Sequence, residues 1–324
     1  MRPRKIRSTY FAERPRDGRE PYNASDIVAI ADSRFLFCDN NISDALFELR
    51  LTPEGQAAGP IVRWPIEGIS AERVDDLEAM ALVEDRGRRF ILAIPSLSLK
   101  RTKIHKETAR RGEAVAARSG LLRIAIGDEG ELRAELLEGF RAWLIDNVPE
   151  LGKAPYCLPD DGGLNIEGLS WSPAEHTLLL GLRTPVIDGQ PIVVRVRVKD
   201  IGGPWTLSNL EMLPAVFLEI DRDRDEQGIR GIEYNSFERD LLIVIGNSTS
   251  ASKAPFNLYR WNGDIDGIVE RCGGVRFHKK MRVEGVARGT IGGRDAIVFV
   301  DDGGGYQILW RDDLSLETGA ASKR

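Results

Sequence analysis

The stretch "NIEGLSWSP", Asn165–Pro173, opens the segment of the sequence that decides the fold. It continues as "AEHTLLLGLRTP", so a polar turn separates two strand-like runs, and the second run is almost entirely apolar. A short, nearly continuous apolar run of this kind is typical of a strand that is buried on both faces. The segment therefore predicts a β-hairpin whose second strand lies in the interior of a sheet.

The same pattern recurs along the chain. Three copies align without a gap: "DLEAMALVEDRGRRFILAIPS", "GIRGIEYNSFERDLLIVIGNS" and "RVEGVARGTIGGRDAIVFVDD". In every copy, the residue 11 positions after the Glu or Arg that opens the first strand lies at or beside the start of the apolar run, as Leu178 does after Glu167. A fifth, shorter copy, "DIVAIADSRFLFCDNN", places Val28 at the position of that Glu. Self-similarity of this kind is the signature of a repeat architecture.

Further strand-like runs follow the hairpins, for example "PIVVRVRV" and "LPAVFLEID" after the copy that contains Glu167. Four antiparallel strands per unit, with polar outer strands, predict an all-β fold of the β-propeller class. Five copies favour five blades, and a sixth blade in the long interval between Glu78 and Glu167 is the alternative. We expect one domain, 1–324, with three special segments. They are an N-terminal segment, 1–25, that supplies a ring-closing strand, a basic loop insertion, 97–120, and a short helical insertion, 138–150.

Composition restricts the class of partner. The 324 residues include 45 basic and 50 acidic side chains, a formal net charge of −5, which does not suggest a nucleic-acid-binding or membrane-binding protein. The sequence contains neither the apolar core of a secretory signal nor an apolar run long enough to span a membrane. We therefore expect a cytoplasmic protein without nucleic-acid or membrane partners.

The repeat also predicts a site. In a hairpin, the start of the first strand and the end of the second lie at the same edge of the sheet. If the first strands line the central channel, the strand-opening residues gather at one mouth of it. The strand-opening candidates at this mouth are Glu78, Glu167, Arg230 and Glu284, with Val28 in the shorter copy. Arg183, beside the end of a second strand, is expected at the same mouth.

Two interpretations of this mouth remain open. Converging carboxylates could hold Ca²⁺ or Mg²⁺, or one Glu with a raised pKa could act as a general acid or base. Alternatively, a Glu repeated in successive blades is a structural clasp that accepts hydrogen bonds from the adjacent blade. The basic loop, whose cations include Lys100, Arg101 and Arg118, leaves from the same mouth and is either a solvated loop or a rim that attracts an anionic ligand.

The motifs "NIEGLSWSP", "DLEAMAL" and "RVEGVARG", taken with "VFVDDGGG", resemble an uncharacterised propeller-like family defined only as a domain of unknown function. The resemblance covers about Asp26 to Trp310. More distantly, the chain is similar to the esterase-like phytase propellers and to the gluconolactonase and regucalcin-like propellers. Those relatives imply hydrolysis of a phosphoester or a lactone with a divalent cation. The resemblance implies the metal ligands Glu167, Glu284, Asn40, Asn247 and Asp301.

We therefore expect a propeller that binds an anionic small molecule at one channel mouth, with metal-dependent hydrolysis as a further hypothesis. The alternative is a non-catalytic scaffold whose loops bind a protein partner. A catalytic role is assigned to no residue, because the sequence lacks the Gly-x-Ser-x-Gly, Walker and His-Glu-x-x-His motifs.

Overall fold

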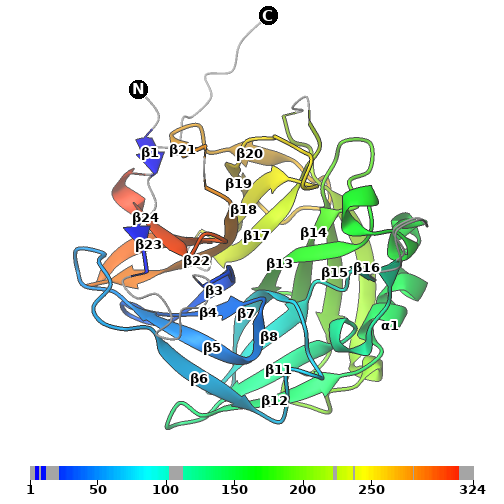
Figure 1. Cartoon of the computed structure of the whole chain (residues 1–324), viewed down its shortest axis with the longest axis horizontal. Helices are drawn as coiled ribbons and strands as arrows, with labels where there is room; N and C mark the ends of the chain where they lie inside the picture. Colours follow the sequence, from blue (N-terminus) through cyan, green and yellow to red (C-terminus); the bar gives the residue numbers. More distant parts are fainter. Residues whose placement is uncertain are drawn as a thin grey trace, which may run out of the picture.

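The computed structural model describes residues 4–6, 9–11, 22–101, 112–221, 225–235, 238–279 and 281–313. Its strands form consecutive antiparallel meanders (Figure 1). The first contains β3 (Ala24–Ala31), β4 (Arg34–Asp39), β5 (Ile42–Arg50) and β6 (Val62–Glu67). The second contains β7 (Leu77–Asp85), β8 (Arg88–Pro95), β11 (Leu121–Ile126) and β12 (Leu132–Leu137). The third contains β13 (Asn165–Ser172), β14 (Thr177–Thr184), β15 (Ile192–Val198) and β16 (Leu210–Phe217). The fourth contains β17 (Gln227–Asn235), β18 (Asp240–Asn247), β19 (Asn257–Trp261) and β20 (Val269–Arg271). The last contains β22 (Val283–Ile291), β23 (Arg294–Asp301), β24 (Gly305–Trp310) and the N-terminal β2 (Thr9–Tyr10).

The innermost strands of these meanders close a ring. Within the described residues, β3 contacts β7, β7 contacts β13, β13 contacts β17, β17 contacts β22, and β22 returns to β3. Figure 1 shows these strands around the centre, with the later strands of each meander farther out. The outer strands β6 and β12 pair in parallel and join the first two meanders into one eight-stranded sheet. The fold is a β-propeller, which confirms the fold class expected from the repeat.

The last sheet combines strands from the first and the last parts of the described chain. Strand β2 pairs antiparallel with β24, so a strand from segment 1–25 forms the outer edge of the sheet built from the end of the chain. Pairing of this kind covers the edge of β24, which would otherwise present unpaired N–H and C=O groups. The rest of segment 1–25 that precedes Tyr22, apart from 4–6 and Phe11, lies outside the described residues.

The remaining elements are short. The only α-helix of the described chain, α1 (Phe140–Asn147), falls inside the predicted insertion 138–150 and lies at the outside of the ring (Figure 1). In the predicted basic loop 97–120, β9 (Lys100–Arg101) pairs with β10 (Gly112–Glu113), while residues 102–111 lie outside the described part. No helix of the described residues is long and apolar enough to cross a membrane. Strands β1 (Arg4–Ile6) and β21 (Val275–Phe277) pair in parallel. The 3₁₀ turns of the described residues are Ala116–Arg118, Pro149–Leu151, Ala154–Tyr156, Pro159–Asp161, Leu207–Asn209 and Arg311–Asp313.

Strand β14 shows why the apolar runs are continuous. Leu178 and Leu180 belong to the hydrophobic cluster shared with the second meander, whereas Leu179 packs into the cluster shared with the fourth. All three leucines are buried. Successive side chains of a strand point to opposite faces, so a blade between two others needs apolar residues at every position. The strand is buried on both faces, as the sequence predicts.

Each innermost strand carries a register irregularity near its start. The ladder skips Glu78, Glu167, Arg230 and Glu284 in their strands, and it skips Ser25 in β3. A β-bulge re-aims the extra side chain and interrupts pairing. The repeated Glu or Arg is therefore the bulged residue, which explains its recurrence.

The assignment of Val28 to this position was wrong, because Ser25 is the bulged residue of β3. The first copy lacks the Glu or Arg that marks the position in the others. A second register shift between Ala29 and Ala31 also changes the residue count along its first strand. Val28 lies farther along the strand and lines a cavity at the other end of the channel.

The glycine after the bulge has a separate role. A Cβ on Gly285 would lie 2.5 Å from the Cα of Asp26, and a Cβ on Gly231 would lie 3.4 Å from the Cα of Gly285. Neighbouring inner strands thus approach so closely that Gly285 cannot carry a side chain without a shift of the backbone. In the Glu-Gly pair, Glu faces the mouth and Gly permits the close packing of the ring.

Candidate functional site

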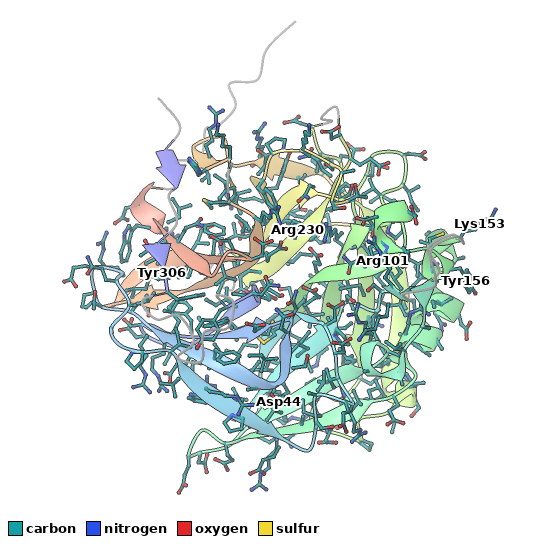
Figure 2. All side chains as sticks on the ribbon, in the orientation of Figure 1. Asp44, Arg101, Lys153, Tyr156, Arg230 and Tyr306 are labelled. Atoms are coloured by element: carbon teal, nitrogen blue, oxygen red, sulfur yellow. The ribbon has the colours of Figure 1, made fainter. Side chains whose placement is uncertain are left out.

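An ion-pair network joins three blades at the channel mouth. The guanidinium of Arg230, on β17, lies 2.9 Å from Oε2 of Glu167, on β13, and also contacts the carboxyl group of Glu284, on β22. All three residues are buried, and the side chain of Arg230 is only 4% exposed. Figure 2 places Arg230 near the centre of the ring. The residue that departs from the repeated Glu thus links the blades on both sides of its own.

Glu167 is the centre of this network. Its Oε1 accepts hydrogen bonds from Nη1 of Arg183 at 2.7 Å and from Nδ2 of Asn165 at 3.0 Å. Nε of Arg183 donates in turn to the backbone carbonyl of Ser248 at 2.8 Å, which connects the third blade with the loop after β18. Charge-assisted hydrogen bonds of this kind hold both partners in one geometry. We call Glu167, Arg183, Arg230 and Glu284 the mouth network.

The buried carboxyl groups of the mouth differ in their pKa values. Burial raises the pKa of Glu284 to about 8, with Glu167 adding to the rise and Arg230 opposing it. Although burial also acts on Glu167, the guanidinium groups of Arg230 and Arg183 hold its pKa below the ordinary value. Burial and the nearby Asp76 and Glu167 raise the pKa of Glu78 well above its ordinary value. Burial thus favours the protonated forms of Glu78 and Glu284, whereas the two guanidinium groups favour the ionised form of Glu167.

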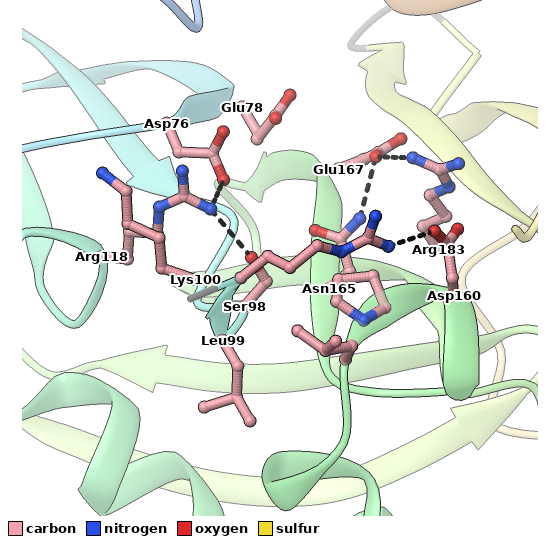
Figure 3. A pocket seen from close by; sticks show the side chains of 13 residues that line it. Asp76, Glu78, Ser98, Leu99, Lys100, Arg118, Asp160, Asn165, Glu167 and Arg183 are labelled. Atoms are coloured by element: carbon pink, nitrogen blue, oxygen red, sulfur yellow. Dashed lines mark hydrogen bonds and ion pairs between the residues drawn. The ribbon is translucent and has the colours of Figure 1, made fainter. Parts of the chain in front are cut away.

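A cavity of about 370 Å³ opens beside the network, over the second and third blades (Figure 3). It lies between the start of the innermost strands and the segments that follow β8 and precede β13. In Figure 3, Glu78 and Asp76 lie on one side of the cavity, and Glu167 and Arg183 lie on the other. The residues that line it are Asp76, Glu78, Ser98, Leu99, Lys100, Arg101, Arg118, Leu158, Pro159, Asp160, Asn165, Glu167 and Arg183.

Exposed ion pairs form the rim of this cavity. Nη2 of Arg101 lies 2.8 Å from Asp160, and Nζ of Lys100 lies 2.9 Å from Asp75. The side chains of Lys100 and Arg101 are 52% and 51% exposed. Arg118 is less exposed and contacts both Asp75, at 2.9 Å, and Asp76, at 2.7 Å. The rim therefore contains cations whose partners face solvent, above a floor whose ion pairs are buried.

The structure brings together all five channel-mouth candidates, since Glu78, Glu167 and Arg183 line the cavity and Arg230 and Glu284 bond to Glu167 beneath it. Sequence reasoning missed Asp76, Asp160 and Asn165. Asp76 immediately precedes the first strand of its blade, and Asn165 lies two residues before Glu167, so their positions next to the repeat were the available signal. Asp160 lies in a non-repeated segment and gave no such signal.

The predicted metal ligands do not form a metal site. Asp301 accepts hydrogen bonds from the backbone N–H of Gly303 at 2.9 Å and from Gln307 at 3.2 Å, within its own blade. The amide oxygen of Asn40 accepts a hydrogen bond from Asn23 at 2.8 Å, and Nδ2 of Asn247 donates to a backbone carbonyl of its own loop at 3.1 Å. The interaction of Asn247 is local to its turn, as is common for Asn, whereas Asn40 pairs side chain to side chain with a residue 17 positions away.

Glu167 and Glu284 do not fit a divalent cation either. Each oxygen of Glu167 lies within 3 Å of a guanidinium nitrogen, and Glu284 contacts the same Arg230. Two buried guanidinium groups at this position oppose a further positive charge by Coulomb repulsion. In the described part of the chain, no group of three or more His, Cys, Asp or Glu side chains could hold a metal ion. Among the described residues, the donor set implied by the resemblance therefore lacks the clustering that a metal site needs.

The sequence matches one known family over most of its length. Residues 70–272 match the family described as "Protein of unknown function (DUF3616)". The chain belongs to this family. No curated protein sequence is detectably similar to this DUF3616 protein.

Solved structures resemble the DUF3616 chain only in fold. The β-propeller domain of Nup133 from Vanderwaltozyma polyspora aligns with a TM-score of 0.41 and 10% identity, over 89% of this chain and 70% of that one. An α-L-arabinofuranosidase from Lactobacillus brevis aligns with a TM-score of 0.48 and 12% identity, over 90% and 92% of the two chains. The Malassezia sympodialis allergen Mala s 1 aligns with a TM-score of 0.45 and 8% identity, over 89% and 92%.

The raised pKa of Glu284 predicts a pH dependence of stability. A Glu in the unfolded chain ionises near its ordinary pKa of 4.5, whereas in the folded protein Glu284 ionises near 8. Between these values the folded state binds more protons, so its stability falls as the pH rises, by up to about 1.4 kcal/mol per pH unit for one group. We expect urea unfolding from pH 5 to pH 9 to show this fall, and Glu284→Gln to show a shallower one. The exposed Glu211→Gln is the control, and equal slopes in all three proteins would contradict the prediction.

Proposed function

We propose that this protein binds a small anionic molecule, carrying a carboxylate or phosphate group, in the cavity beside the mouth network. The observation that supports this proposal is the set of cations that converge on the cavity from separate segments. Lys100 and Arg101 follow β8, Arg118 lies in a 3₁₀ turn, and Arg183 is near the end of β14. The volume of about 370 Å³ suits a small molecule.

The charge balance of the lining favours an anion more than a simple count suggests. The four cations face the same number of carboxyl groups, namely Asp76, Glu78, Asp160 and Glu167. Burial raises the pKa of Asp76 and of Glu78, so these two groups carry less negative charge than their formal count. A protonated Glu78 is also a hydrogen-bond donor, which suits the oxygen of an anionic ligand. The lining therefore combines fixed positive charge with two carboxyl groups whose protonated forms are favoured by burial.

Replacing one partner of an exposed ion pair at the rim changes the free energy only slightly. An ion pair between exposed side chains typically contributes about 0–1 kcal/mol, because water and salt screen it. A ligand carboxylate or phosphate can therefore replace Asp160 at Arg101, or Asp75 at Lys100, with little loss. The buried pairs of Glu167 with Arg183 and Arg230 are costly to break and would stay in place. Ligand binding thus requires rearrangement only at the rim.

We test the proposal with citrate and inorganic phosphate as probes. Isothermal titration calorimetry should detect binding that weakens as the salt concentration rises, because screening acts on exposed charges. Arg101→Ala, and more strongly the double variant Lys100→Ala with Arg101→Ala, should weaken citrate binding, by about tenfold for the double variant if each lost contact contributes about 0.7 kcal/mol.

Arg197→Ala is the matched control for this experiment. Arg197 is also an exposed arginine in an ion pair, 2.9 Å from Glu211, but it lies on the outer part of the third blade and does not line the cavity. We expect its affinity for citrate to equal that of the unmodified protein. If neither anion binds, or if the rim variants bind as well as the control, the anion-binding proposal is wrong, and a protein-binding rim becomes the better explanation.

A further inference from the structure

A second and larger cavity lies at the opposite end of the central channel. Its volume is about 620 Å³, and all five innermost strands of the described chain line it through their second halves. Val28 of β3, Leu82 of β7 and Arg288 of β22 are among the lining residues. The mouth cavity, in contrast, is lined from the starts of β7 and β13. The two cavities are therefore separate sites at the two ends of the inner strands.

The balance of charged groups in this second cavity differs from that at the mouth. Its described lining contains four acidic side chains and one cation, Arg288. The acidic residues are Asp32, Glu84, Glu233 and Asp295. Asp295 lies 2.9 Å from Arg311 and 3.5 Å from Arg288, so its charge is already balanced. Glu84 also has a cationic partner, Nε of Arg89 at 3.7 Å. Among the residues that line the cavity, carboxyl groups nevertheless outnumber cationic groups by four to one.

Aromatic side chains line the same cavity. Trp171, at the end of β13, and Tyr234, at the end of β17, are both in the lining, together with aliphatic residues such as Leu82. Aromatic faces attract cations electrostatically and also bury apolar surface. The combination of carboxyl groups with aromatic rings is the chemistry that recognises an organic cation.

A buried hydroxyl group provides independent evidence for a ligand. Ser170 is only 1% exposed and lines the cavity, and its Oγ has no hydrogen-bond partner among the described atoms. Buried polar groups nearly always have a partner, because an unsatisfied one costs about 1–3 kcal/mol. Ser170 and Trp171 are adjacent on β13, so their side chains point to opposite faces of the strand, and both residues line the cavity. A ligand with an N–H donor would satisfy this oxygen.

Glu233, near the end of β17, supplies a carboxyl group to the lining of the same cavity. One of its oxygens accepts a hydrogen bond from the backbone N–H of Arg288 at 3.2 Å, which fixes its position against the neighbouring blade. Burial raises the pKa of Glu233 to about 8. A cation bound beside it would favour the ionised form and form an ion pair in a partly desolvated site.

We propose that the cavity at this end of the channel binds a small protonated amine, whose apolar part lies against Trp171 and Tyr234 and whose ammonium group contacts Glu233 and Ser170. The volume of about 620 Å³ lies within the range of small-molecule pockets. This site is distinct from the proposed anion site, since no residue lines both cavities. The protein would then bind ligands of opposite charge at the two ends of its channel.

Benzylamine, at pH 7, is the probe that tests this proposal on the full chain, with benzyl alcohol and benzoate as neutral and anionic analogues of the same ring. Calorimetric titration should detect binding of benzylamine, at least tenfold weaker binding of benzyl alcohol, and no binding of benzoate. Glu233→Gln keeps an oxygen for the N–H of Arg288 but cannot ionise, and it should weaken benzylamine binding about tenfold. Ser170→Ala should weaken it several-fold.

Two controls locate the binding. Glu211→Gln removes an exposed carboxylate of the third blade that does not line the cavity. The double variant Lys100→Ala with Arg101→Ala alters only the rim of the mouth cavity. Both should bind benzylamine like the unmodified protein. Absence of benzylamine binding, equal binding of benzoate, or unchanged affinity in folded Glu233→Gln and Ser170→Ala would each overturn the proposal, whatever the outcome for citrate at the mouth.

Discussion

Replacing Arg230 with Gln is expected to lower the free energy of unfolding by about 3–5 kcal/mol, the range for removing one partner of a buried ion pair. The guanidinium of Arg230 bonds to Glu167 on one side and Glu284 on the other. Without it, both carboxyl groups lose their shared cation, and the third, fourth and last blades lose a direct link. Urea denaturation measures the change, and the exposed Arg63→Gln, whose partner is Asp44, should change stability by no more than about 1 kcal/mol.

The loss caused by Arg230→Gln should depend on pH. Arg230 and Arg183 hold the pKa of Glu167 below its ordinary value against the effect of burial, so removing Arg230 raises that pKa. At low pH the carboxyl groups take up protons and need no cation, whereas at high pH they must ionise without one. We therefore expect the loss to be larger at pH 8 than at pH 5.

A triple variant separates the role of the charges from that of the packing. Arg230→Met combined with Glu167→Gln and Glu284→Gln removes the guanidinium and both carboxyl groups together and leaves side chains of similar size. Buried ion pairs replaced by neutral groups often regain the lost stability. The triple variant should thus be more stable than Arg230→Gln. If Arg230→Gln unfolds at the same urea concentration as the unmodified protein at both pH values, the mouth network does not hold the ring together.

The repeat in the sequence allowed the fold class to be predicted because every blade has the same packing requirement. Every blade needs a central strand that is apolar on both faces, as β14 shows with Leu178 and Leu179. Every innermost strand of the described chain carries a bulge near its start, and Glu or Arg occupies it in all but β3. At these positions the local sequence pattern and the tertiary packing require the same residue types, so the pattern predicts the fold.

The role of the repeated carboxyl groups was harder to predict. The sequence predicts Glu167 and Glu284 at one mouth and allows Arg230 to pair with either of them or with an anionic ligand, but it does not show that Arg230 contacts both. The clasp hypothesis was nearer to the structure than the metal hypothesis, although the partner is a guanidinium and not a backbone N–H. The distinction depends on distances of about 3 Å between blades, such as that from Arg230 to Glu167, and hairpin spacing carries no information about them.

Asp26 does what the clasp hypothesis expected of the Glu residues. It follows the bulge of β3, where Gly168, Gly231 and Gly285 follow the bulges of other blades. The structure accommodates the side chain of Asp26 because Gly285, in the adjacent inner strand, has no Cβ. One carboxyl oxygen accepts a hydrogen bond from the N–H of Met80 in the next blade at 2.7 Å, and the other accepts one from Ile27 at 2.8 Å. Burial raises the pKa of this carboxyl group well above its ordinary value.

Asp26→Ala should therefore destabilise the protein by about 2–5 kcal/mol, because two buried N–H groups lose their acceptors at about 1–3 kcal/mol each. Asp26→Asn keeps the volume and one acceptor oxygen but turns an NH₂ group toward the second N–H, so it should lose about half as much. Asp44→Ala, at an exposed position of the same blade that is labelled in Figure 2, is the control and should lose at most about 1 kcal/mol. Urea denaturation gives the three values. An Asp26→Ala protein as stable as Asp44→Ala would show that these hydrogen bonds do not hold the first and second blades together. If Asp26→Ala instead loses the most stability and Asp44→Ala the least, contacts that hold the ring closed include this carboxyl group as well as the network around Arg230.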